Sequence, residues 1–362
     1  MRHSFCLSLL TVLAWTAPFD PARAQTLTRV EAKDFGKMLD GTVVKQFTLR
    51  NAKGMSAKVM TYAAMLCEVQ APDRNGVFTN VVPGTDAFEN YLRSGVPASQ
   101  VIGRVANRVA NARFTLDGVV YQLDANMFGH LLHGGTNGFG RRVWQAEMLP
   151  PGATESSVRF TIFSKDGDDG YPGNMTASVT YTLNDNNELR LDYQATADKP
   201  TPVNLCIHSY FNLAGYTVGS SSYRDQELWL NADHYTPTDD QLIPTGEIAP
   251  VKGTPLDFTT PGLIGEHADK LNARRGFDHN FVINGGGESM VLAARARDPQ
   301  SGRVLEVRTT QPGLQLYTGN RSAFALETQH FPDSVNHTNF PSTILRPGEM
   351  FKSTTVFVFS AK

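Results

Sequence analysis

The stretch TASVTYTLNDNNELRLDYQA, residues 176–195, decides the fold of this chain. Residues 176–183 and 188–195 alternate apolar and polar side chains, which is the period of a strand that buries one face. Residues 184–187 lie between them and are of the types that favour a tight turn. The stretch therefore predicts an antiparallel β-hairpin with one face against a hydrophobic core.

The same kind of run recurs along most of the chain. The dipeptide Asp117-Gly118 separates ARFTL from VVYQL and is itself a hairpin-turn signal. Helical periodicity is nearly absent, and no repeat of fixed length is present, which disfavours a propeller or a solenoid. The predicted fold class is all-β, a large antiparallel β-sandwich. The other strand-like runs are residues 42–49, 58–69, 157–163, 303–309 and 354–359.

The first residues have the pattern of a secretory signal peptide. A basic start precedes an apolar run, residues 5–15, that is shorter than the roughly 20 residues needed to span a bilayer. Ala22-Arg23-Ala24 then forms a cleavage motif, so we expect residues 1–24 to be removed before Gln25. A buried N-terminal helix is disfavoured because two prolines interrupt the segment. The protein is therefore expected to be exported, to the periplasm or the medium.

Composition narrows the expected partners. The formal net charge is -2 at pH 7, which offers no basic footprint for nucleic acid. Outside residues 1–24 only Cys67 and Cys206 remain, too few for a disulfide framework. Two separate buried thiols are favoured over a bridge, although spacing alone does not decide between them. Residues 25–362 contain no Ser/Gly linker and are expected to form a single domain.

Polar side chains inside strand-like, aromatic-rich segments carry the chemical signal, because their burial costs free energy unless a partner or a ligand satisfies them. The first such segment, residues 102–114, is IGRVANRVANARF and contains Asn107 and Arg108. Arginine offers a planar fork of donors and asparagine offers a donor and an acceptor, which suits the hydroxyls of a polyol. An arginine that braces a loop through backbone carbonyls is an equally good interpretation of this spacing.

The second segment, HLLHGG, places His130 and His133 before two glycines. A zinc site needs further ligands, and no Glu or Cys follows nearby, so a metal ion is disfavoured. The glycines instead allow the backbone to turn tightly beside a ligand, which leaves His133 to donate a hydrogen bond. We expect no metal here and treat His133 as a candidate sugar contact.

The third segment, residues 204–215, is NLCIHSYFNLAG. On a strand, Cys206, His208 and Tyr210 share one face, while Leu205 and Ile207 have the character of core residues. A histidine titrates near pH 6.5 and can therefore hold and release a proton as a general acid. A structural histidine bonded to a backbone carbonyl is the commoner fate of an isolated His, but the polar neighbours of His208 favour the chemical role.

The fourth region combines GFDHNF, residues 276–281, with LQLY and LETQ further along the chain. Asp278 lies in an aromatic setting, where it either caps a turn or accepts hydrogen bonds from hydroxyls. Alternation puts Gln315 and Tyr317 on the face opposite the leucines of LQLY. Glu327 has almost no other acid close by in the sequence, which makes it a candidate general base.

Short motifs follow one another along the chain: APDRNG (71–76), GRVANRVANARFTLDG (103–118), LHGG (132–135), DGYPGN (169–174), PVNL (202–205), HSYFNLAG (208–215), GFDHNF (276–281), QPGLQLYTGN (311–320), LETQ (326–329) and FPSTILRPGE (340–349). In this order, over residues 42–360, the chain resembles the aldose 1-epimerase (galactose mutarotase) family. The resemblance implies a galactose mutarotase-like supersandwich. It also implies an isomerase that interconverts the α and β anomers of free aldohexoses, such as glucose and galactose, without a cofactor.

The same resemblance implies roles for individual residues. Glu327 in LETQ matches the general base of the family, and His208 in HSYFNLAG matches its general acid. Sugar-binding positions are matched by Asn107, Arg108, His133, Tyr210, Asp278 and Gln315.

The chain departs from the family pattern in three places. Cys206-Ile207 replaces the usual Thr-Asn before the histidine, and the turn at residues 61–64 differs. Ile207 is expected to point away from His208 and to affect packing more than chemistry. The connection from Gly319-Asn320 to Phe324 looks shorter than in many relatives, which bears on sugar preference rather than on the reaction.

Two other functions are disfavoured by the sequence. An exported carbohydrate-binding protein without turnover needs no matched acid and base, so the presence of both Glu327 and His208 argues against it. A hexose-phosphate epimerase on the same fold needs a basic cluster for the phosphate, and the arginine pair Arg141-Arg142 near a motif is better interpreted as a solvated surface pair. The expected partner is a monosaccharide, with no nucleic acid, no membrane anchor after signal cleavage, and a monomer or weak homodimer. The preferred aldose and the oligomeric state stay open.

Overall fold

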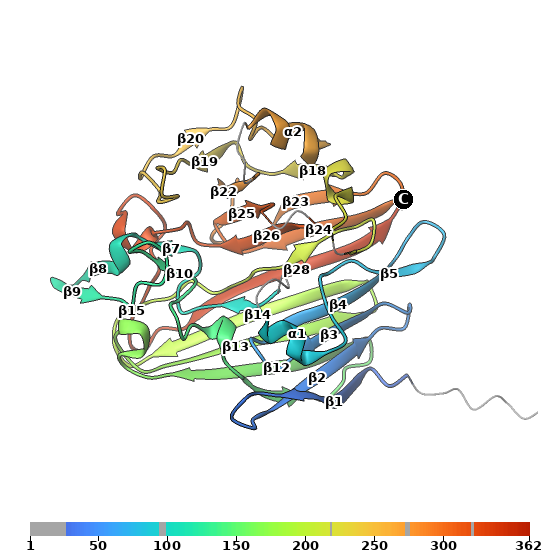
Figure 1. Ribbon diagram of the computed structural model, residues 1–362, viewed down its shortest axis with the longest axis horizontal. Helices are drawn as coiled ribbons and strands as arrows, with labels where there is room; N and C mark the ends of the chain where they lie inside the picture. The colour runs from blue at the N-terminus through green and yellow to red at the C-terminus, as the bar shows by residue number, and fades with distance from the viewer. Residues whose placement is uncertain (1–26, 94–98, 218, 272–275, 320–321) are drawn as a thin grey trace, which may run out of the picture.

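The largest element of the computed structural model is an antiparallel sheet of nine strands (Figure 1). The structure describes residues 27–93, 99–217, 219–271, 276–319 and 322–362, so the expected signal peptide lies outside it. The hairpin predicted from residues 176–195 is present and Tyr181 pairs with Leu191 across it. Across the sheet the strands are β11 (Gln145–Met148), β12 (Glu155–Ser164), β13 (Met175–Asn184), β14 (Glu188–Ala197), β28 (Phe351–Ala361), β24 (Arg303–Thr309), β23 (Val291–Arg297), β18 (Glu227–Leu230) and β21 (Gly262–Leu263).

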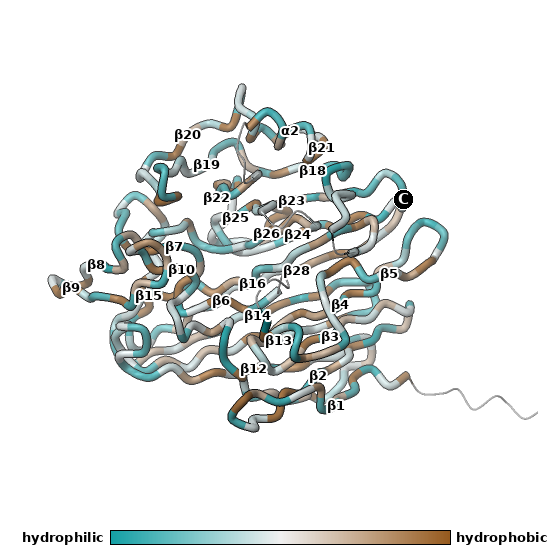
Figure 2. The backbone as a smooth tube through the Cα atoms, viewed as in Figure 1, coloured by the Kyte–Doolittle hydropathy of each residue, from teal (hydrophilic) through white to brown (hydrophobic). Residues whose placement is uncertain are grey.

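Burial alternates along these strands, as the sequence predicts. On β13, Ala177, Val179 and Tyr181 are buried, and the residues between them are partly or fully exposed. Figure 2 shows the same alternation as brown and teal steps along the strands. One face of the nine-stranded sheet is therefore apolar and has to be covered.

Two smaller sheets cover that face. Phe47 of the five-stranded sheet packs on Phe160, with ring centroids 5.8 Å apart, and Phe211 of the six-stranded sheet packs on Phe357 at 5.1 Å. One hydrophobic cluster joins all three sheets, which confirms a large β-sandwich. The five-stranded sheet has β1 (Val30–Lys37), β2 (Val43–Arg50), β3 (Ser56–Met60), β4 (Met65–Pro72) and β5 (Phe78–Asn80); the six-stranded sheet has, in order, β17 (Tyr210–Phe211), β26 (Phe324–Gln329), β25 (Gly313–Tyr317), β22 (Asp278–Val282), β19 (His234–Thr236) and β20 (Ala249–Pro250).

Short strand pairs and turns complete the described part of the chain. At the left of Figure 1 the β8–β9 hairpin projects, and its loop residues Asp117 and Gly118 have φ of 51° and 80°, as a type I′ turn requires. No helix among the described residues is long and apolar enough to cross a membrane. The pairs are β6 (Val101–Ile102) with β16 (Cys206–Ile207), β7 (Arg108–Val109) with β10 (Leu131–Leu132), β8 (Arg113–Leu116) with β9 (Val119–Gln122), and β15 (Thr201–Pro202) with β27 (Ile344–Leu345); the helices are α1 (Phe88–Leu92) and α2 (Ile264–Lys270), with 3₁₀ turns at Ala110–Ala112, Phe139–Arg141, Asp168–Gly170, Ser222–Asp225 and Ser334–Asn336.

The single run expected over residues 58–69 was wrong, because β3 and β4 form a hairpin there. The chain turns at Ala63 and Ala64, whose φ are 61° and 44°. Both alanines are fully buried, and the Ala63 N–H donates to the carbonyl of Arg142. A turn that lies inside the core is built from small apolar residues, so it lacks the Gly, Pro and Asn signals on which the prediction depended.

The two cysteines outside the expected signal peptide are both buried and free. The interpretation of Cys67 and Cys206 as separate thiols is therefore confirmed.

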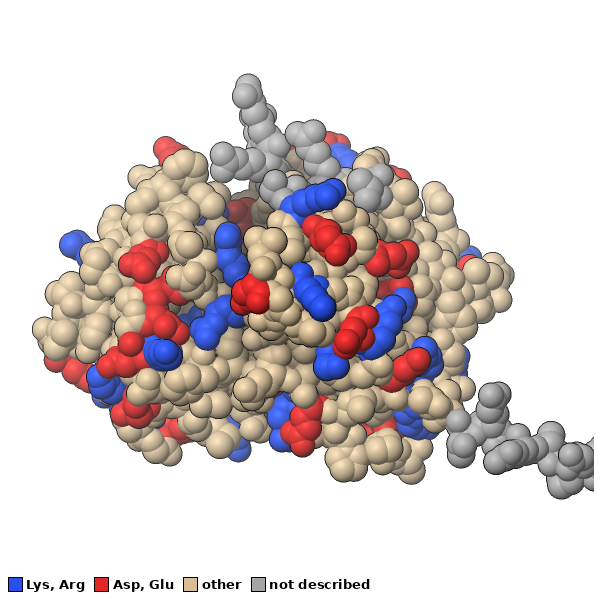
Figure 3. Space-filling model, turned by 60° about the horizontal axis from the view of Figure 1, so that its bottom comes forward, with Lys and Arg blue, Asp and Glu red and all other residues tan. Residues whose placement is uncertain are grey.

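The protein surface carries charges of both signs. On the face in Figure 3, acidic and basic side chains are interspersed rather than gathered by sign.

Arg104, four residues before Arg108, braces the loops around it through hydrogen bonds from its guanidinium group. Its side chain is buried and donates to the carbonyl oxygens of Pro172 and Lys165 at 2.8 and 3.0 Å, and to the hydroxyls of Ser164 and Thr201. Burial lowers the pKa of Arg104 to about 10, so it stays protonated at neutral pH. Of the two interpretations left open for this segment, bracing applies to Arg104.

Arg104→Ala is expected to lower the free energy of unfolding by about 2–4 kcal/mol, because it leaves buried carbonyl oxygens without a donor. Urea denaturation followed by tryptophan fluorescence measures the loss. Arg190→Ala is the control, since Arg190 is half exposed and pairs with Asp192 at the surface, where a pair contributes about 0–1 kcal/mol. Equal losses in the two variants would contradict a bracing role for Arg104.

Candidate active site

A large cavity lies over the face of the six-stranded sheet that points away from the core. On β25, Leu314 and Leu316 belong to the hydrophobic core, and Tyr317 lines the cavity on the opposite face. On β26, Leu326 enters the core and Glu327 lines the cavity. The alternation predicted for LQLY is therefore confirmed, and LETQ alternates in the same way. The cavity has a volume of about 1620 Å³.

Strand register brings the polar residues of this face together. Gln315 pairs with Glu327 across β25 and β26, and Asp278 pairs with Tyr317 across β22 and β25. Gln315 does not line the cavity; its Nε2 donates to Asp278 Oδ1 at 2.6 Å. In this structure Gln315 therefore orients Asp278, and Asp278 is the residue that faces the cavity.

A second wall of the cavity comes from the segments around β7 and β10. Arg108 lies with Nη2 3.4 Å from Asp278 Oδ2 and donates from Nη1 to Asn107 Oδ1 at 3.3 Å. Asn107 and His133 are linked twice, because the His133 N–H donates to the Asn107 carbonyl and the Asn107 N–H donates to His133 Nδ1. Since Nδ1 accepts, the proton of neutral His133 is on Nε2, where it can be donated to a ligand.

The glycines after His133 have the role expected from the sequence. Gly134 has a φ of 84°, and a side chain there would meet the carbonyl oxygen of Gly103 at 1.9 Å. Only a residue without Cβ allows this close approach of two backbone segments. His130 is held by hydrogen bonds, with Nδ1 accepting from the Asn111 N–H and Nε2 2.6 Å from Gln241 Oε1.

Within the described part of the chain, no group of three or more His, Cys, Asp or Glu side chains has the arrangement to hold a metal ion.

His208 meets Glu327 at the floor of the cavity. His208 Nε2 and Glu327 Oε1 are 3.3 Å apart, and both side chains are almost fully buried. The expectation of one continuous strand over residues 204–211 was wrong, because β16 ends at Ile207 and β17 begins at Tyr210. The side chains nevertheless point as predicted, because Leu205 and Ile207 enter the core, while His208 and Tyr210 line the cavity.

Aromatic rings surround the imidazole of His208. It stacks on Tyr210 with centroids 4.7 Å apart and an interplanar angle of 27°, and it meets His133 and Tyr317 edge to face at 5.4 and 5.7 Å. Tyr317 was not among the predicted site residues. Alternation in LQLY had placed it on the correct face, but its contact with His208 depends on the pairing of strands far apart in the chain.

Burial sets the protonation of the pair. Burial raises the pKa of Glu327 well above its usual range, the charge of Asp278 raises it further, and Arg108 opposes both. Burial lowers the pKa of His208 to about 4, against an upward influence of its backbone and Asp278. Burial therefore favours the neutral form of both groups, the carboxylic acid for Glu327 and the neutral imidazole for His208.

Cys206 is a further neighbour of Glu327 that the family pattern did not supply. Its Sγ lies 4.0 Å from Glu327 Oε2, and the residue is fully buried. Burial raises the pKa of the Cys206 thiol, and the charge of Glu327 adds to this, so the sulfur stays protonated as a weak donor.

All of the predicted site residues thus meet in one place. Asn107, Arg108, His133, His208, Tyr210, Asp278 and Glu327 line the cavity, and Gln315 reaches it through Asp278. Asn320 and Arg321, which belong to the short connection before Phe324, lie outside the described residues. The arrangement offers a buried acid–base pair at the floor and hydrogen-bonding groups on the walls.

Known proteins that are similar to this chain in sequence include an aldose 1-epimerase and a galactose mutarotase. The model of the aldose 1-epimerase family matches residues 45–358. Galactose mutarotase of Rattus norvegicus is 43% identical over 343 residues, which cover 90% of this chain and 97% of that protein. Aldose 1-epimerase of Escherichia coli strain K12 is 35% identical over 343 residues, covering 89% and 97%.

Solved structures agree with the sequence matches. The crystal structure of galactose 1-epimerase from Lactobacillus acidophilus has a TM-score of 0.78 at 29% identity and covers 92% of this chain and 98% of that one. An aldose epimerase homologue from C. elegans has a TM-score of 0.77 at 30% identity, covering 87% and 98%.

Proposed function

This chain belongs to the aldose 1-epimerase family, and we propose that its Glu327 and His208 interconvert the α and β anomers of free aldohexoses. The enzyme is an isomerase, and glucose and galactose are the aldoses on which to test it first. The observation that carries the residue assignment is the 3.3 Å contact between His208 Nε2 and Glu327 Oε1 on the floor of the cavity.

Ring opening requires one proton to leave the C1 hydroxyl and one to reach the ring oxygen. When the single proton of the pair is on His208, Glu327 is a carboxylate that takes the hydroxyl proton. His208 then gives its proton to the ring oxygen as the bond from C1 to that oxygen breaks. The pair ends with Glu327 protonated and His208 neutral, which is the form that burial favours.

Ring closure uses the same two groups in reverse. Rotation about the C1–C2 bond presents the other face of the aldehyde, and the ring hydroxyl returns its proton to His208 as Glu327 protonates the carbonyl oxygen. The cycle therefore ends as it began, with the proton on His208 and Glu327 as the carboxylate. The acid and the base exchange roles between ring opening and ring closure.

The walls of the cavity hold the sugar while its ring is open. Arg108 and the Nε2–H of His133 are donors, Asp278 is an acceptor, and Asn107 is bonded to both Arg108 and His133. Hydrogen bonds and an ion pair link these groups, so each holds its neighbour in place. Such positioning prevents the open chain from drifting out of reach of the pair.

Polarimetry on freshly dissolved α-D-glucose and α-D-galactose tests the reaction. We expect the optical rotation to approach its equilibrium value faster with the protein than in buffer, in proportion to protein concentration. No acceleration with either sugar would refute an aldohexose mutarotase.

Export is a second part of the proposal and depends on residues 1–24. Their basic start, short apolar run and Ala22-Arg23-Ala24 motif support cleavage before Gln25. Amino-terminal sequencing of the protein recovered from the periplasm or medium is expected to begin at Gln25. Recovery only from the cytoplasm, with Met1 retained, would contradict it.

A further inference from the structure

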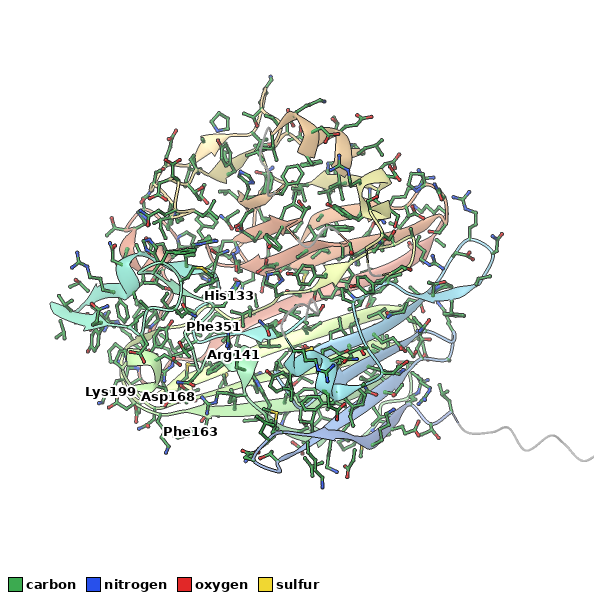
Figure 4. The ribbon with its side chains drawn as sticks, viewed as in Figure 1. His133, Arg141, Phe163, Asp168, Lys199 and Phe351 are labelled. Carbon is green, nitrogen blue, oxygen red and sulfur yellow. The ribbon has the colours of Figure 1, made fainter. Side chains whose placement is uncertain are left out.

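The side chains that hold the sugar are carried outside the three large sheets. We define the sugar-binding wall as Asn107, Arg108 and His133, which lie on and beside the strand pair of β7 and β10. Within the described residues these two strands pair only with each other. Figure 4 shows His133 well away from Phe163, which lies near the end of β12 in the nine-stranded sheet. Contacts outside the large sheets therefore have to hold the sugar-binding wall at its distance from Glu327.

Asn204 ties the segment that leads into the sugar-binding wall to the strand of Glu327. Its side chain pairs with the backbone of His330, just after β26: Oδ1 accepts from the N–H at 3.0 Å and Nδ2 donates to the carbonyl oxygen at 3.2 Å. The backbone N–H of Asn204 donates to the carbonyl of Arg104 at 3.0 Å, and its own carbonyl accepts from the N–H of Ala106 at 2.8 Å. This buried residue therefore fixes the wall at its amino-terminal end.

Asp333 fixes the other end of the wall. Its N–H donates to the carbonyl of Arg108 at 2.9 Å, and its Oδ1 accepts from the N–H of Ala110 at 3.0 Å. The two bonds lie on either side of Val109, so together they set both the position and the direction of β7. Asp333 follows β26 on the chain, and it thereby links β7 to the strand that carries Glu327.

The carboxylate of Asp333 serves β7 and not its own turn. Asp333 precedes the 3₁₀ turn Ser334–Asn336, a position where an aspartate side chain commonly caps the N–H groups of the turn. The Asp333 side chain makes no such bond. Its Oδ1 accepts instead from the Ala110 N–H and, at 2.7 Å, from Asn336 Nδ2, while Oδ2 lies 3.3 Å from His337 Nε2. The side chain is thus held in one place and directed at β7.

The backbone of Asp333 restricts which residues can replace it. Its φ of 58° is in the left-handed region, which Gly, Asn and Asp adopt most easily. Asparagine keeps this conformation and an oxygen for the Ala110 N–H. Glycine keeps the conformation and removes the oxygen. The two substitutions therefore separate the role of the oxygen from the strain of the backbone.

A shift of β7 would move every donor of the sugar-binding wall. The Arg108 guanidinium contacts Asp278 at 3.4 Å and Asn107 at 3.3 Å, and Asn107 is hydrogen-bonded to His133 in both directions. Glu327 lies within the six-stranded sheet and keeps its place when β7 moves. The distance between the wall and the base therefore depends on what holds β7.

On the basis of the proposed function, we propose that Asp333 is a positioning residue of the epimerase reaction. It is not among the residues that line the cavity, so it acts on the sugar through Arg108, Asn107 and His133. Its carboxylate oxygen sets the distance between the sugar-binding wall and the acid–base pair, and hence how tightly the sugar is held.

Asp333→Gly is expected to raise KM for α-D-galactose by about 3- to 10-fold, because the wall loses its fixed place over the sugar. The kcat is expected to stay within about twofold of wild type, since binding of the ground state and of the transition state weaken alike. Asp333→Asn keeps the oxygen for Ala110 and is expected to restore the wild-type KM, although it removes the charge that faces His337. Polarimetry at several sugar concentrations gives both constants.

Ala110→Pro removes the same hydrogen bond from its other partner. Ala110 is the first residue of a 3₁₀ turn, and the φ of −122° and ψ of 120° at Val109 are compatible with a following proline. This variant lacks the N–H that Asp333 accepts, and it is expected to raise KM to the same extent as Asp333→Gly. If Asp333→Gly does not fold, Ala110→Pro decides the proposal.

Asp298→Ala is the matched control for the loss of a buried aspartate. Asp298 is buried, and its Oδ2 accepts from the N–H of Ser301 at 2.8 Å in the turn between β23 and β24. It is not among the residues that line the cavity. Urea denaturation is expected to show a loss of stability in Asp298→Ala and in Asp333→Gly alike, but only Asp333→Gly is expected to raise KM.

An unchanged KM in Asp333→Gly would overturn the positioning role, as would an equal rise in Asp298→Ala or a failure of Asp333→Asn to restore KM. Isothermal titration calorimetry with D-galactose gives an independent measurement, because Kd is expected to rise in Asp333→Gly by the same factor as KM. If the wild-type protein binds galactose but does not accelerate mutarotation, the proposed function fails and calorimetry still decides the role of Asp333. If it neither binds nor converts the sugar, both proposals fail.

Discussion

Glu327→Gln is expected to lower kcat for mutarotation by about 10²–10⁴-fold, the usual contribution of one positioned proton transfer. Glutamine has the size and shape of glutamate, but its amide cannot take the proton of the C1 hydroxyl. The fold is expected to remain, because Glu327 makes its contacts at the cavity floor and the core side of β26 is formed by Phe324 and Leu326. Polarimetry with α-D-galactose gives the rate, and thermal unfolding gives the stability.

The pKa of Glu327 also predicts the direction in which Glu327→Gln changes the stability of the fold. Burial raises the folded-state pKa of Glu327 above its unfolded value. Its contribution to stability is therefore complete at acid pH and is lost as pH rises from about 4.3 through the raised pKa. Glutamine never ionises, so Glu327→Gln is expected to unfold at the same temperature as wild type at pH 7 or at a higher one.

The control for this variant is Glu306→Gln, which removes a carboxylate that pairs with Arg295 and Arg308 on the nine-stranded sheet. Its mutarotase activity is expected to stay within about twofold of wild type, as for a surface change away from a site. A rate close to wild type in Glu327→Gln would sink the proposed base.

His208→Gln is expected to lower kcat by about 10²–10³-fold, because glutamine cannot carry a proton to the ring oxygen. The wild-type enzyme is also expected to lose kcat/KM as pH falls through about 4, where His208 takes a second proton while Glu327 still holds the first. The pair then has no base. This acid limb is expected to be absent from the residual activity of His208→Gln.

His330→Gln is the control that distinguishes a chemical role of His208 from the effect of removing a buried histidine. Burial also lowers the pKa of His330 to about 4, but His330 does not line the cavity. Its removal is expected to leave kcat and the acid limb unchanged. A loss of the acid limb in His330→Gln, or its persistence in His208→Gln, would show that another group than His208 controls it.

The predicted facing of side chains along strands was confirmed, whereas the continuous strands expected over residues 58–69 and 204–211 are interrupted. The hairpin at residues 176–195 and the facing of Tyr317 on LQLY both follow from the two-residue period of a strand. The turn at Ala63 and Ala64 was missed because turn signals assume exposure to solvent. Arg104 and Arg108 looked alike in the sequence, and only their surroundings separate a brace from a cavity residue.

The sequence by itself determined the all-β class, the turns between adjacent strands and the side of each strand on which a polar residue lies. These are short-range properties, set by the backbone and by the nearest side chains. The tertiary structure alone decided that His208 meets Glu327 and that Gln315 acts through Asp278. Those contacts depend on which distant strands pair and in what register, and that choice comes from burying the apolar faces of three sheets together.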